Sequence, residues 1–322
     1  MRLPSFESLT SASWYAYSDE PISTGHWYSG GLCDPYLIMR DESPDGIWHL
    51  FAHTWAGIMH YTSSSGLDWK EEHLAILRGH SPYIYRIDDT YLMLYETHDK
   101  PYQKAEDKSK VSRIEMVTSS DLRLWSKPRV LLTALSVPYS ATGERRRLSS
   151  PQLVSYQGRL RLYFGAGETI MYDSKRHCSV YFGYAESESI TAPFVPSPEP
   201  LMTGDPDGSV ASLALGNVRI IPCADGFAAL ASSYSYLKAE KRSTATLQLY
   251  TSFDGLNFNY SRTLITPSKE GWMSSYITSA SAKYSQAESS WYCYFSAEEK
   301  KSFIQKHTTG GKLGLLLGRV IK

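Results

Sequence analysis

The stretch "GGLCDPYLIMRDESPDGIWHLFAHT", residues 30–54, decides the fold. The acidic residue Asp34 precedes a short apolar run, a polar turn follows, and a second apolar run ends at His53. Two apolar runs around a turn rich in Asp, Ser, Pro and Gly predict a β-hairpin. This hairpin begins with a carboxylate beside a buried strand. An ionised group in such a place must be satisfied by partners or shifted in pKa.

The hairpin pattern returns four times along the chain. The copies are residues 81–97, 150–164, 217–232 and 276–296. Further strands follow most copies, joined by Ser/Asp/Gly turns with an aromatic residue, as in "SSSGLDW" and "TSFDGLNF". Five units of about four strands each indicate radial repetition. We therefore predict an all-β fold, a five-bladed β-propeller with four-stranded antiparallel blades around a central axis.

A single domain over residues 1–322 is expected, with blades starting near 34, 81, 150, 217 and 276. The fifth unit lacks an outer strand. We expect the N-terminal residues 1–30, through their segment "SASWYAYSDEP", to supply that strand and close the ring. No long stretch has a 3.6-residue apolar period, so a helical fold is disfavoured. A six-bladed, sialidase-like propeller is a weaker alternative, because only five inner hairpins can be counted.

Composition narrows the classes of partner. Lysine plus arginine equals aspartate plus glutamate at 33 each, so the chain has no general attraction to nucleic acid or anionic lipid. The four cysteines are scattered, and no secretory or membrane-spanning apolar segment is seen, which favours a cytoplasmic protein with reduced thiols. No zinc spacing or phosphate loop is present, so no cofactor is expected. The oligomeric state is left open.

Polar residues are expected to converge on one face of the propeller. The start of each inner strand and the end of the antiparallel second strand emerge on the same side. The residues placed there are Asp34, Ser81, Ser150, Asn217 and the region of Tyr276, with His53, Trp55, Glu96, His98, Asp99, Glu168, Ser232, Ser233 and Glu298. A convergent polar cluster at the mouth of a β architecture is the default binding site.

Two neighbouring features add to this face. His80 stands beside Ser81 and is a ligand contact, a proton carrier or a hydrogen-bonded core group. The segment "GERRRLSSP" delivers Arg147 just before the third inner strand. Its arginines are either a solvated loop or a clamp for a carboxylate or phosphate of the substrate.

The chain resembles the five-bladed propeller glycosidases, a superfamily that includes glycoside hydrolase families 32, 43, 68, 117 and 130. "CDPYLI" with "GIWHLFAHT" is similar to the first-blade Asp-Pro motif of family 43, and "SPYIYRIDDTYLMLYE" and "SSPQLVSYQGRLRLYF" are similar to later blades. The resemblance implies a hydrolase acting on a small or oligomeric sugar, with Asp34 as general base. The third-blade Asp-Pro position reads Ser150-Pro151, however, and Asn217 stands where the fourth-blade acid is expected. An axial calcium ion, held by some members, stays open.

Hydrolysis of a glycoside needs two carboxyl groups, so the second acid is expected to be Glu168 or Glu96. The expected substrate contacts are His53, Trp55, His80, Ser81, His98, Asp99, Arg147, Ser150 and Asn217. Two alternatives remain because a fold does not fix a function. One is a carbohydrate-binding propeller that has lost hydrolysis. The other is a biosynthetic enzyme that reuses the propeller pocket.

Overall fold

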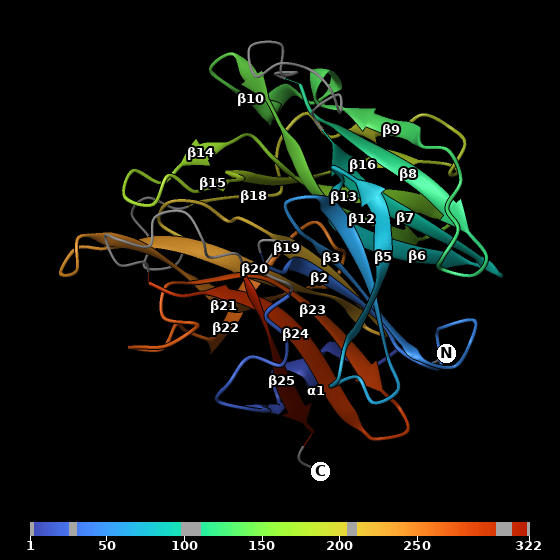
Figure 1. The fold of residues 1–322 in the computed structure, drawn as a ribbon. Coiled ribbons are helices and arrows are strands. Elements are labelled where there is room, and N and C mark those ends of the chain that lie inside the picture. Colours follow the sequence, from blue (N-terminus) through green and yellow to red (C-terminus); the bar gives the residue numbers. More distant parts are fainter. Residues whose placement is uncertain (1–2, 26–30, 98–110, 205–210, 301–310, 321–322) are drawn as a thin grey trace.

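The computed structural model describes residues 3–25, 31–97, 111–204, 211–300 and 311–320 (Figure 1). This part of the chain is built almost entirely of strands, with one α-helix, α1 (Phe6–Thr10). Ser5 caps that helix, because its side chain accepts a hydrogen bond from the backbone N–H of Ser8. Within these ranges, no helix has the length and apolar character that crossing a membrane requires.

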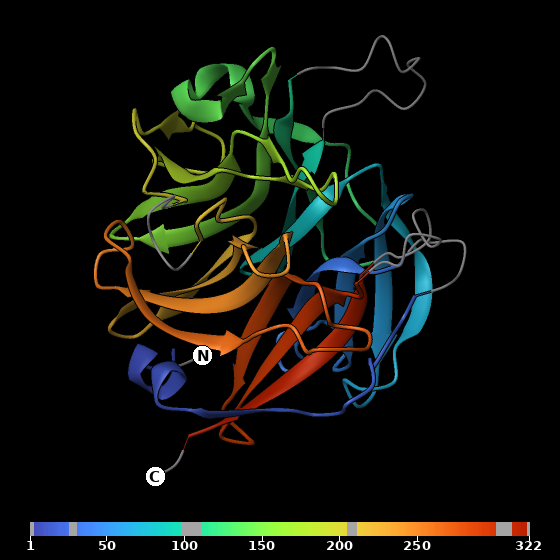
Figure 2. The same cartoon turned by 90° about the vertical axis from the view of Figure 1, so that its left-hand side faces the viewer.

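The strands form five antiparallel units, and one parallel pair, Ala245 opposite Tyr276, joins the fourth unit to the fifth. The first unit contains β2 (Cys33–Ile38), β3 (Trp48–His53), β4 (Gly57–Ser63) and β5 (Lys70–Leu77), and the second contains β6 (His80–Ile87), β7 (Thr90–Thr97), β8 (Arg113–Ser119) and β9 (Arg129–Thr133). The third contains β12 (Leu148–Tyr156), β13 (Arg159–Ala166) and β16 (Tyr181–Ser187), with the short β17 (Val195–Pro196) and β18 (Met202–Thr203). The fourth contains β19 (Val218–Cys223), β20 (Gly226–Leu237), β21 (Arg242–Ser252) and β22 (Asn259–Ile265). The fifth is β23 (Tyr276–Ser285), β24 (Ser290–Glu298), β25 (Lys312–Arg319) and β1 (Ser13–Ala16). Figure 2 shows these units arranged around a common centre. The predicted five-bladed β-propeller is confirmed.

The outer strand of the last blade comes from the other end of the chain. β1 pairs with β25 in an antiparallel register that runs from Ser13 opposite Arg319 to Ala16 opposite Leu316. Leu9, just before β1, is fully buried in the apolar cluster of the fourth and fifth blades. The N-terminal segment therefore supplies the outer strand of the fifth unit.

The first three inner strands share a bulge near their start. Asp34, Ser81 and Ser150 each precede a proline and have φ of 51°, 50° and 48°. Positive φ is uncommon for a residue other than glycine, and a following proline disfavours helical conformations further. Each of these strands also shifts register against its neighbour at this point. The extra residue turns equivalent side chains of three blades toward a common region.

The predicted Ser/Asp/Gly turns close the outer hairpins of three blades. In each, a serine hydroxyl accepts a hydrogen bond of 2.9 Å from the backbone N–H three residues later. The serines are Ser63, Ser119 and Ser252, and the donors are Gly66, Leu122 and Gly255. All three donors have positive φ, between 62° and 77°, which explains the preference for glycine at two of them.

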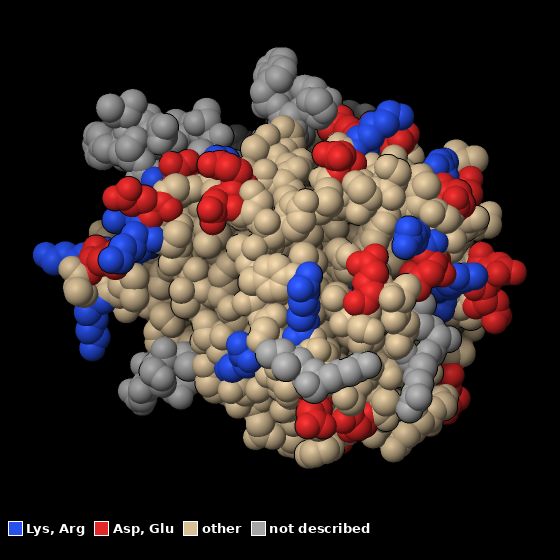
Figure 3. Space-filling model, turned by 90° about the horizontal axis from the view of Figure 1, so that it is seen from below, with Lys and Arg blue, Asp and Glu red and all other residues tan. Residues whose placement is uncertain are grey.

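The apolar core lies between neighbouring blades. One cluster joins the first three blades, a second joins the first and fifth, and a third joins the third and fourth. Burial of these sheet faces against one another fixes the positions of the inner strands. On the side of the molecule seen in Figure 3, acidic and basic side chains are interspersed, in keeping with the zero formal net charge.

Candidate active site

Asp34 lies at the point where all five blades contribute a polar side chain. Its Oδ2 accepts a hydrogen bond of 2.7 Å from the Ser81 hydroxyl, and its Oδ1 accepts one of 3.1 Å from Asn217 Nδ2. Asn217 Nδ2 also donates to Ser150 Oγ at 3.0 Å. The backbone N–H of Asp34 donates to Ser279 Oγ of the fifth blade at 3.0 Å. Four of the residues expected to converge thus form one hydrogen-bonded cluster, with Asp34 at its centre.

The cluster holds Asp34 as an anion. Its side chain is 17% exposed, and burial alone would raise the pKa of its carboxyl. The His53 imidazole, 3.7 Å away, the Ser81 hydroxyl and the Arg219 guanidinium act in the opposite direction and prevail. The pKa of the Asp34 carboxyl is therefore held well below its usual range, and the group is ionised at neutral pH.

Two histidines extend from this carboxylate. His53 Nδ1 faces Asp34, and His53 Nε2 lies 2.7 Å from His80 Nδ1. One proton is shared between those two ring nitrogens, so the tautomer of His80 follows from that of His53. Trp55, in the turn after β3, is 74% exposed. It follows His53 by two residues, at the end of β3 that pairs with the start of β2.

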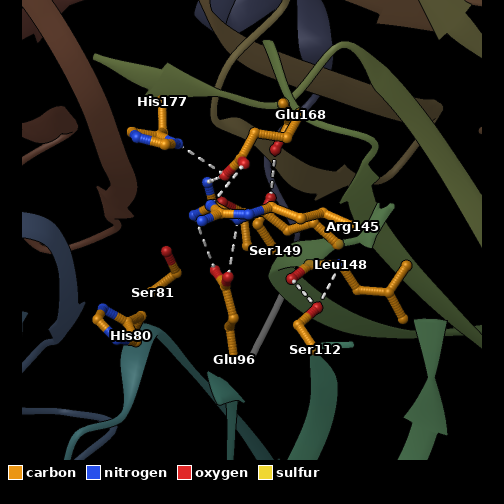
Figure 4. Close-up of polar contacts among 12 residues, drawn as sticks. His80, Ser81, Glu96, Ser112, Arg145, Leu148, Ser149, Glu168 and His177 are labelled. Carbon is orange, nitrogen blue, oxygen red and sulfur yellow. Dashed lines mark hydrogen bonds and ion pairs between the residues drawn. The ribbon is translucent and has the colours of Figure 1, made fainter. Parts of the chain in front are cut away.

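A second cluster lies on the side of the second and third blades (Figure 4). Arg147 Nε donates to Glu96 Oε1 at 2.9 Å, and Arg147 Nη1 donates to Glu168 Oε1 at 2.8 Å. Arg145 Nη1 adds a bond of 3.3 Å to Glu168 Oε2. The Glu96 side chain is fully buried, whereas that of Arg145 is 60% exposed. The interpretation as a solvated loop thus fails for Arg147, which forms ion pairs with two buried carboxylates.

Glu168 is an anion in this arrangement. Burial raises the pKa of its carboxyl, but the charge of Arg147 and the neighbouring His177 outweigh this, and the net shift is downward. His177 Nδ1 lies 3.1 Å from Glu168 Oε1 (Figure 4). A general acid that works near neutral pH needs a raised pKa. The environment of Glu168 therefore opposes its expected role as the second acid.

A hairpin that the sequence did not indicate reaches from the third blade to the next two. We call residues 169–178, with the two-residue strands β14 (Thr169–Ile170) and β15 (His177–Cys178), the crossing hairpin. Its Asp173 accepts hydrogen bonds from the backbone N–H and the hydroxyl of Ser243 on β21, at 2.6 and 2.7 Å. Its Arg176 forms an ion pair with Glu298 on β24. The crossing hairpin thus carries His177 while it is anchored on the fourth and fifth blades.

His98 and Asp99 lie outside the described residues. Ser232 and Ser233 are buried in β20, with hydroxyls that have no partner in the described ranges. Burial, together with the charges of Glu298 and Asp34, raises the pKa of the Cys33 thiol to about 12, which leaves it unreactive. Among the described residues, no group of three or more His, Cys, Asp and Glu side chains is arranged to hold a metal ion.

Neither a family model nor a curated protein matches the sequence, whereas solved structures do match the fold. A family 117 glycoside hydrolase from Zobellia galactanivorans aligns with a TM-score of 0.58 and 15% identity, over 96% of this chain and 91% of that one. The catalytic domain of a GH62 α-L-arabinofuranosidase from Coprinopsis cinerea gives 0.64 and 12%, over 96% and 98%. An N-acetylgalactosamine deacetylase from F. plautii, in complex with blood group B trisaccharide, gives 0.62 and 13%, over 95% of each chain. At these identities the likeness concerns the fold, and for the fold the resemblance to the propeller glycosidases is confirmed.

Proposed function

We propose that this chain is a carbohydrate-active enzyme of the glycoside hydrolase type, with Asp34 as its general base. The observation that carries the proposal is the ionised Asp34 carboxylate, held by Ser81 and Asn217 from other blades where all inner strands begin. A general base must be deprotonated at the working pH and fixed in position. The Asp34 cluster meets both requirements.

Features around Asp34 suit a sugar ligand. Asn217 Oδ1 is buried and has no hydrogen-bond partner within the described part of the chain, so it is available to accept a bond from a sugar hydroxyl. The exposed indole of Trp55 offers a face on which a sugar ring can stack. The trisaccharide in the complex of the similar deacetylase gives independent support for a carbohydrate in this architecture.

We infer that the proton donor is a group other than a carboxylic acid. Glu96 is enclosed beneath Arg147, and Glu168 is stabilised as an anion. His177 is 43% exposed, and its Nδ1 faces Glu168. We therefore propose that His177 donates the proton through its Nε2, with Glu168 fixing the ring orientation. Direct donation by Glu96 or Glu168 is the second candidate, and it requires Arg147 to leave its present contacts.

A propeller that binds carbohydrate without hydrolysing it is the alternative function. The observation that favours it is the position of Arg147, which forms ion pairs with both Glu96 and Glu168. The third alternative is a biosynthetic enzyme that uses the same pocket for a reaction other than glycoside hydrolysis. The deacetylase among the similar structures illustrates that one fold serves more than one chemistry.

The test compares Asp34→Asn with Asp45→Asn in the full chain. Asp45 is a matched control, because it also contacts a histidine, His49, at 2.8 Å and also has a lowered pKa, about 2, but lies in the turn at the other end of the first blade. Turnover is measured with a panel of aryl glycosides and by release of reducing sugar from oligosaccharides. Removal of the base should lower kcat by roughly 10²- to 10⁴-fold, whereas Asp45→Asn should retain it.

The outcomes separate the readings. Wild-type turnover in Asp34→Asn contradicts the role of Asp34 as base. A parent protein that hydrolyses nothing in the panel, but whose Tm rises with added sugar, supports the binding alternative. Equal losses in both variants would indicate a general structural effect instead of a catalytic one.

A further inference from the structure

Further along the inner strands than the Asp34 cluster, each blade contributes a second side chain to the propeller axis. Each of these residues lies two positions beyond the one that the same blade gives to the Asp34 cluster. We call the second set the axial layer. It consists of Tyr36, Tyr83, Gln152, Arg219 and Ser281.

The axial layer ties the blades together through hydrogen bonds to backbone groups. The Tyr36 hydroxyl donates to a carbonyl of the second blade at 2.7 Å, that of Tyr83 donates to a carbonyl of the third blade at 2.9 Å, and Gln152 bonds two backbone groups of the fourth blade. Ser281 accepts a bond of 3.5 Å from the backbone N–H of Leu37 in the first blade. The axial layer thus sets how the inner strands lie relative to one another.

Arg219 of the fourth blade makes the connection that spans the axis. Its Nη2 donates to the carbonyl of Pro82 in the second blade at 2.8 Å, and its Nη1 donates to that of Pro151 in the third at 3.4 Å. Pro82 and Pro151 directly follow Ser81 and Ser150, the bulge residues with positive φ. A strained backbone of this kind persists only where the surrounding structure fixes it. Arg219 therefore holds, with one side chain, the two bulges that give hydroxyls to the candidate active site.

Arg219 is itself held in place. The residue is 3% exposed, and its guanidinium carbon lies 5.9 Å from the ring centroids of both Tyr36 and Tyr83. On the far side from Asp34, these three residues line a cavity of about 390 Å³ that extends to Ile38 and Ile221. Because the axial layer borders open space there, its hydrogen bonds and not packing from that side keep it in position.

The charge of Arg219 also acts on Asp34. Burial raises the pKa of the Asp34 carboxyl, and His53, Ser81 and Arg219 lower it, in that order of effect. Burial likewise lowers the pKa of the Arg219 guanidinium, and the Asp34 carboxylate is the largest of the charges that oppose this. An arginine stays protonated in proteins, so the axial layer presents a lasting positive charge to the carboxylate.

We propose that Arg219 is a positioning residue for Asp34: it fixes the bulges of the second and third blades from the axial layer and thereby aims Ser81 and Ser150 at the Asp34 cluster. Its role in a reaction rests on the proposed function of Asp34 as general base, whereas its structural link to Asp34 does not. The planar fork of a guanidinium reaches two carbonyls at once, which the compact ammonium group of lysine matches less well. An arginine is therefore needed at this position for its shape as well as for its charge.

The test compares Arg219→Met and Arg219→Lys with Arg161→Met in the full chain. Arg161 is a matched control, because it is also buried, at 6% exposure, donates to the backbone carbonyl of Asp254 in another blade at 2.7 Å, and lies 4.8 Å from the ring centroid of Tyr156. It belongs to β13, the second strand of the third blade, and not to the axial layer.

Two readouts need no substrate. The backbone amide shifts of Ser81 and Ser150 in ¹H–¹⁵N NMR spectra should change in both Arg219 variants and less in Arg161→Met. Carboxyl-selective ¹³C NMR should show Asp34 titrating at a higher pH in Arg219→Met than in the wild type, because a positive charge is lost, whereas Arg219→Lys should keep the low pKa.

Turnover of aryl glycosides is the third readout. In Arg219→Met, kcat should fall at least about tenfold with a nearly unchanged KM, because the base is misplaced while the substrate contacts remain. Arg219→Lys should give an intermediate kcat. Arg161→Met should keep the wild-type kcat despite a loss of stability.

Three results would overturn the proposal. They are amide shifts of Ser81 and Ser150 that change no more in the Arg219 variants than in Arg161→Met, an Asp34 titration unaffected by Arg219→Met, and equal kcat in the two methionine variants. A wild type that hydrolyses no glycoside would contradict the proposed function alone, since the NMR readouts still decide the link from Arg219 to Asp34. Should Arg219→Met fail to fold, the amide shifts in Arg219→Lys decide it.

Discussion

Ser81 donates a hydrogen bond of 2.7 Å to Asp34 although 47 residues separate the two in sequence. They occupy the same position in neighbouring blades, before a proline and with φ near 50°. The repeated bulge thus places a hydroxyl beside a carboxylate. The repeat supplies the geometry of the site, and the identity of the residue at each copy supplies its chemistry.

Ser81→Ala should raise the pKa of the Asp34 carboxyl, because a donor to the charged form is lost. The free energy of unfolding at neutral pH should fall by about 1.5–3 kcal/mol, as for hydrogen bonds to charged groups. The pKa is measured by carboxyl-selective ¹³C NMR. The matched control is Ser150→Ala, at the same position of the next blade, whose hydroxyl bonds Asn217 and not Asp34. An equal rise of the pKa in both variants would refute the assignment of the Ser81 bond as the dominant hydroxyl contact.

Arg147→Met should be strongly destabilising. It removes the guanidinium that pairs with the fully buried Glu96, and breaking a buried ion pair on one side costs about 3–5 kcal/mol. Urea unfolding followed by tryptophan fluorescence measures this loss. Arg145→Met, which removes the 60% exposed neighbour that contacts Glu168, should cost less than about 1 kcal/mol.

A double variant tests the cause of that loss. In Arg147→Met with Glu96→Gln, the uncompensated charge is gone, and much of the stability should return. Were the double variant no more stable than Arg147→Met alone, lost packing of the arginine and not the buried charge would be responsible.

The sequence predicted those features that local patterns encode. The blade starts and the convergence of Asp34, Ser81, Ser150 and Asn217 follow from strand alternation and from the repeated residue before proline. A one-residue bulge repeats with the blade, so its consequences can be read from the repeat.

The crossing hairpin could not be predicted in this way. Its strands β14 and β15 have two residues each, too few to show any apolar alternation. The contacts that anchor it are also non-local, since Arg176 meets Glu298 from another blade. The ion pairs of Arg147 with Glu96 and Glu168 are non-local in the same way, so the sequence did not show them. These pairs weaken the case for either glutamate as the general acid.

Deletion of residues 1–20 should cost most of the stability of the fold. It removes β1, exposes the edge of β25 and uncovers the cluster in which Leu9 is buried. Tm and the soluble fraction are the measurements. Leu9→Ala alone should cost about 2–5 kcal/mol, whereas Tyr17→Ala, at a side chain that is 47% exposed, should change little. A soluble deletion variant that unfolds cooperatively at the wild-type Tm would contradict the role of β1 in ring closure.

Stability should fall as the pH drops below about 6.5, because of His60. Burial, reinforced by His49 and other nearby positive groups, lowers the pKa of the fully enclosed His60 ring from 6.5 to about 3. Between these values the unfolded chain binds a proton that the folded chain does not. The contribution of neutral His60 is therefore complete above pH 6.5 and is lost toward pH 3, with a slope of at most about 1.4 kcal/mol per pH unit. Urea unfolding at a series of pH values should show a shallower slope of stability against pH in His60→Gln than in the wild type. Identical slopes in the wild type and His60→Gln would show that another group controls acid sensitivity.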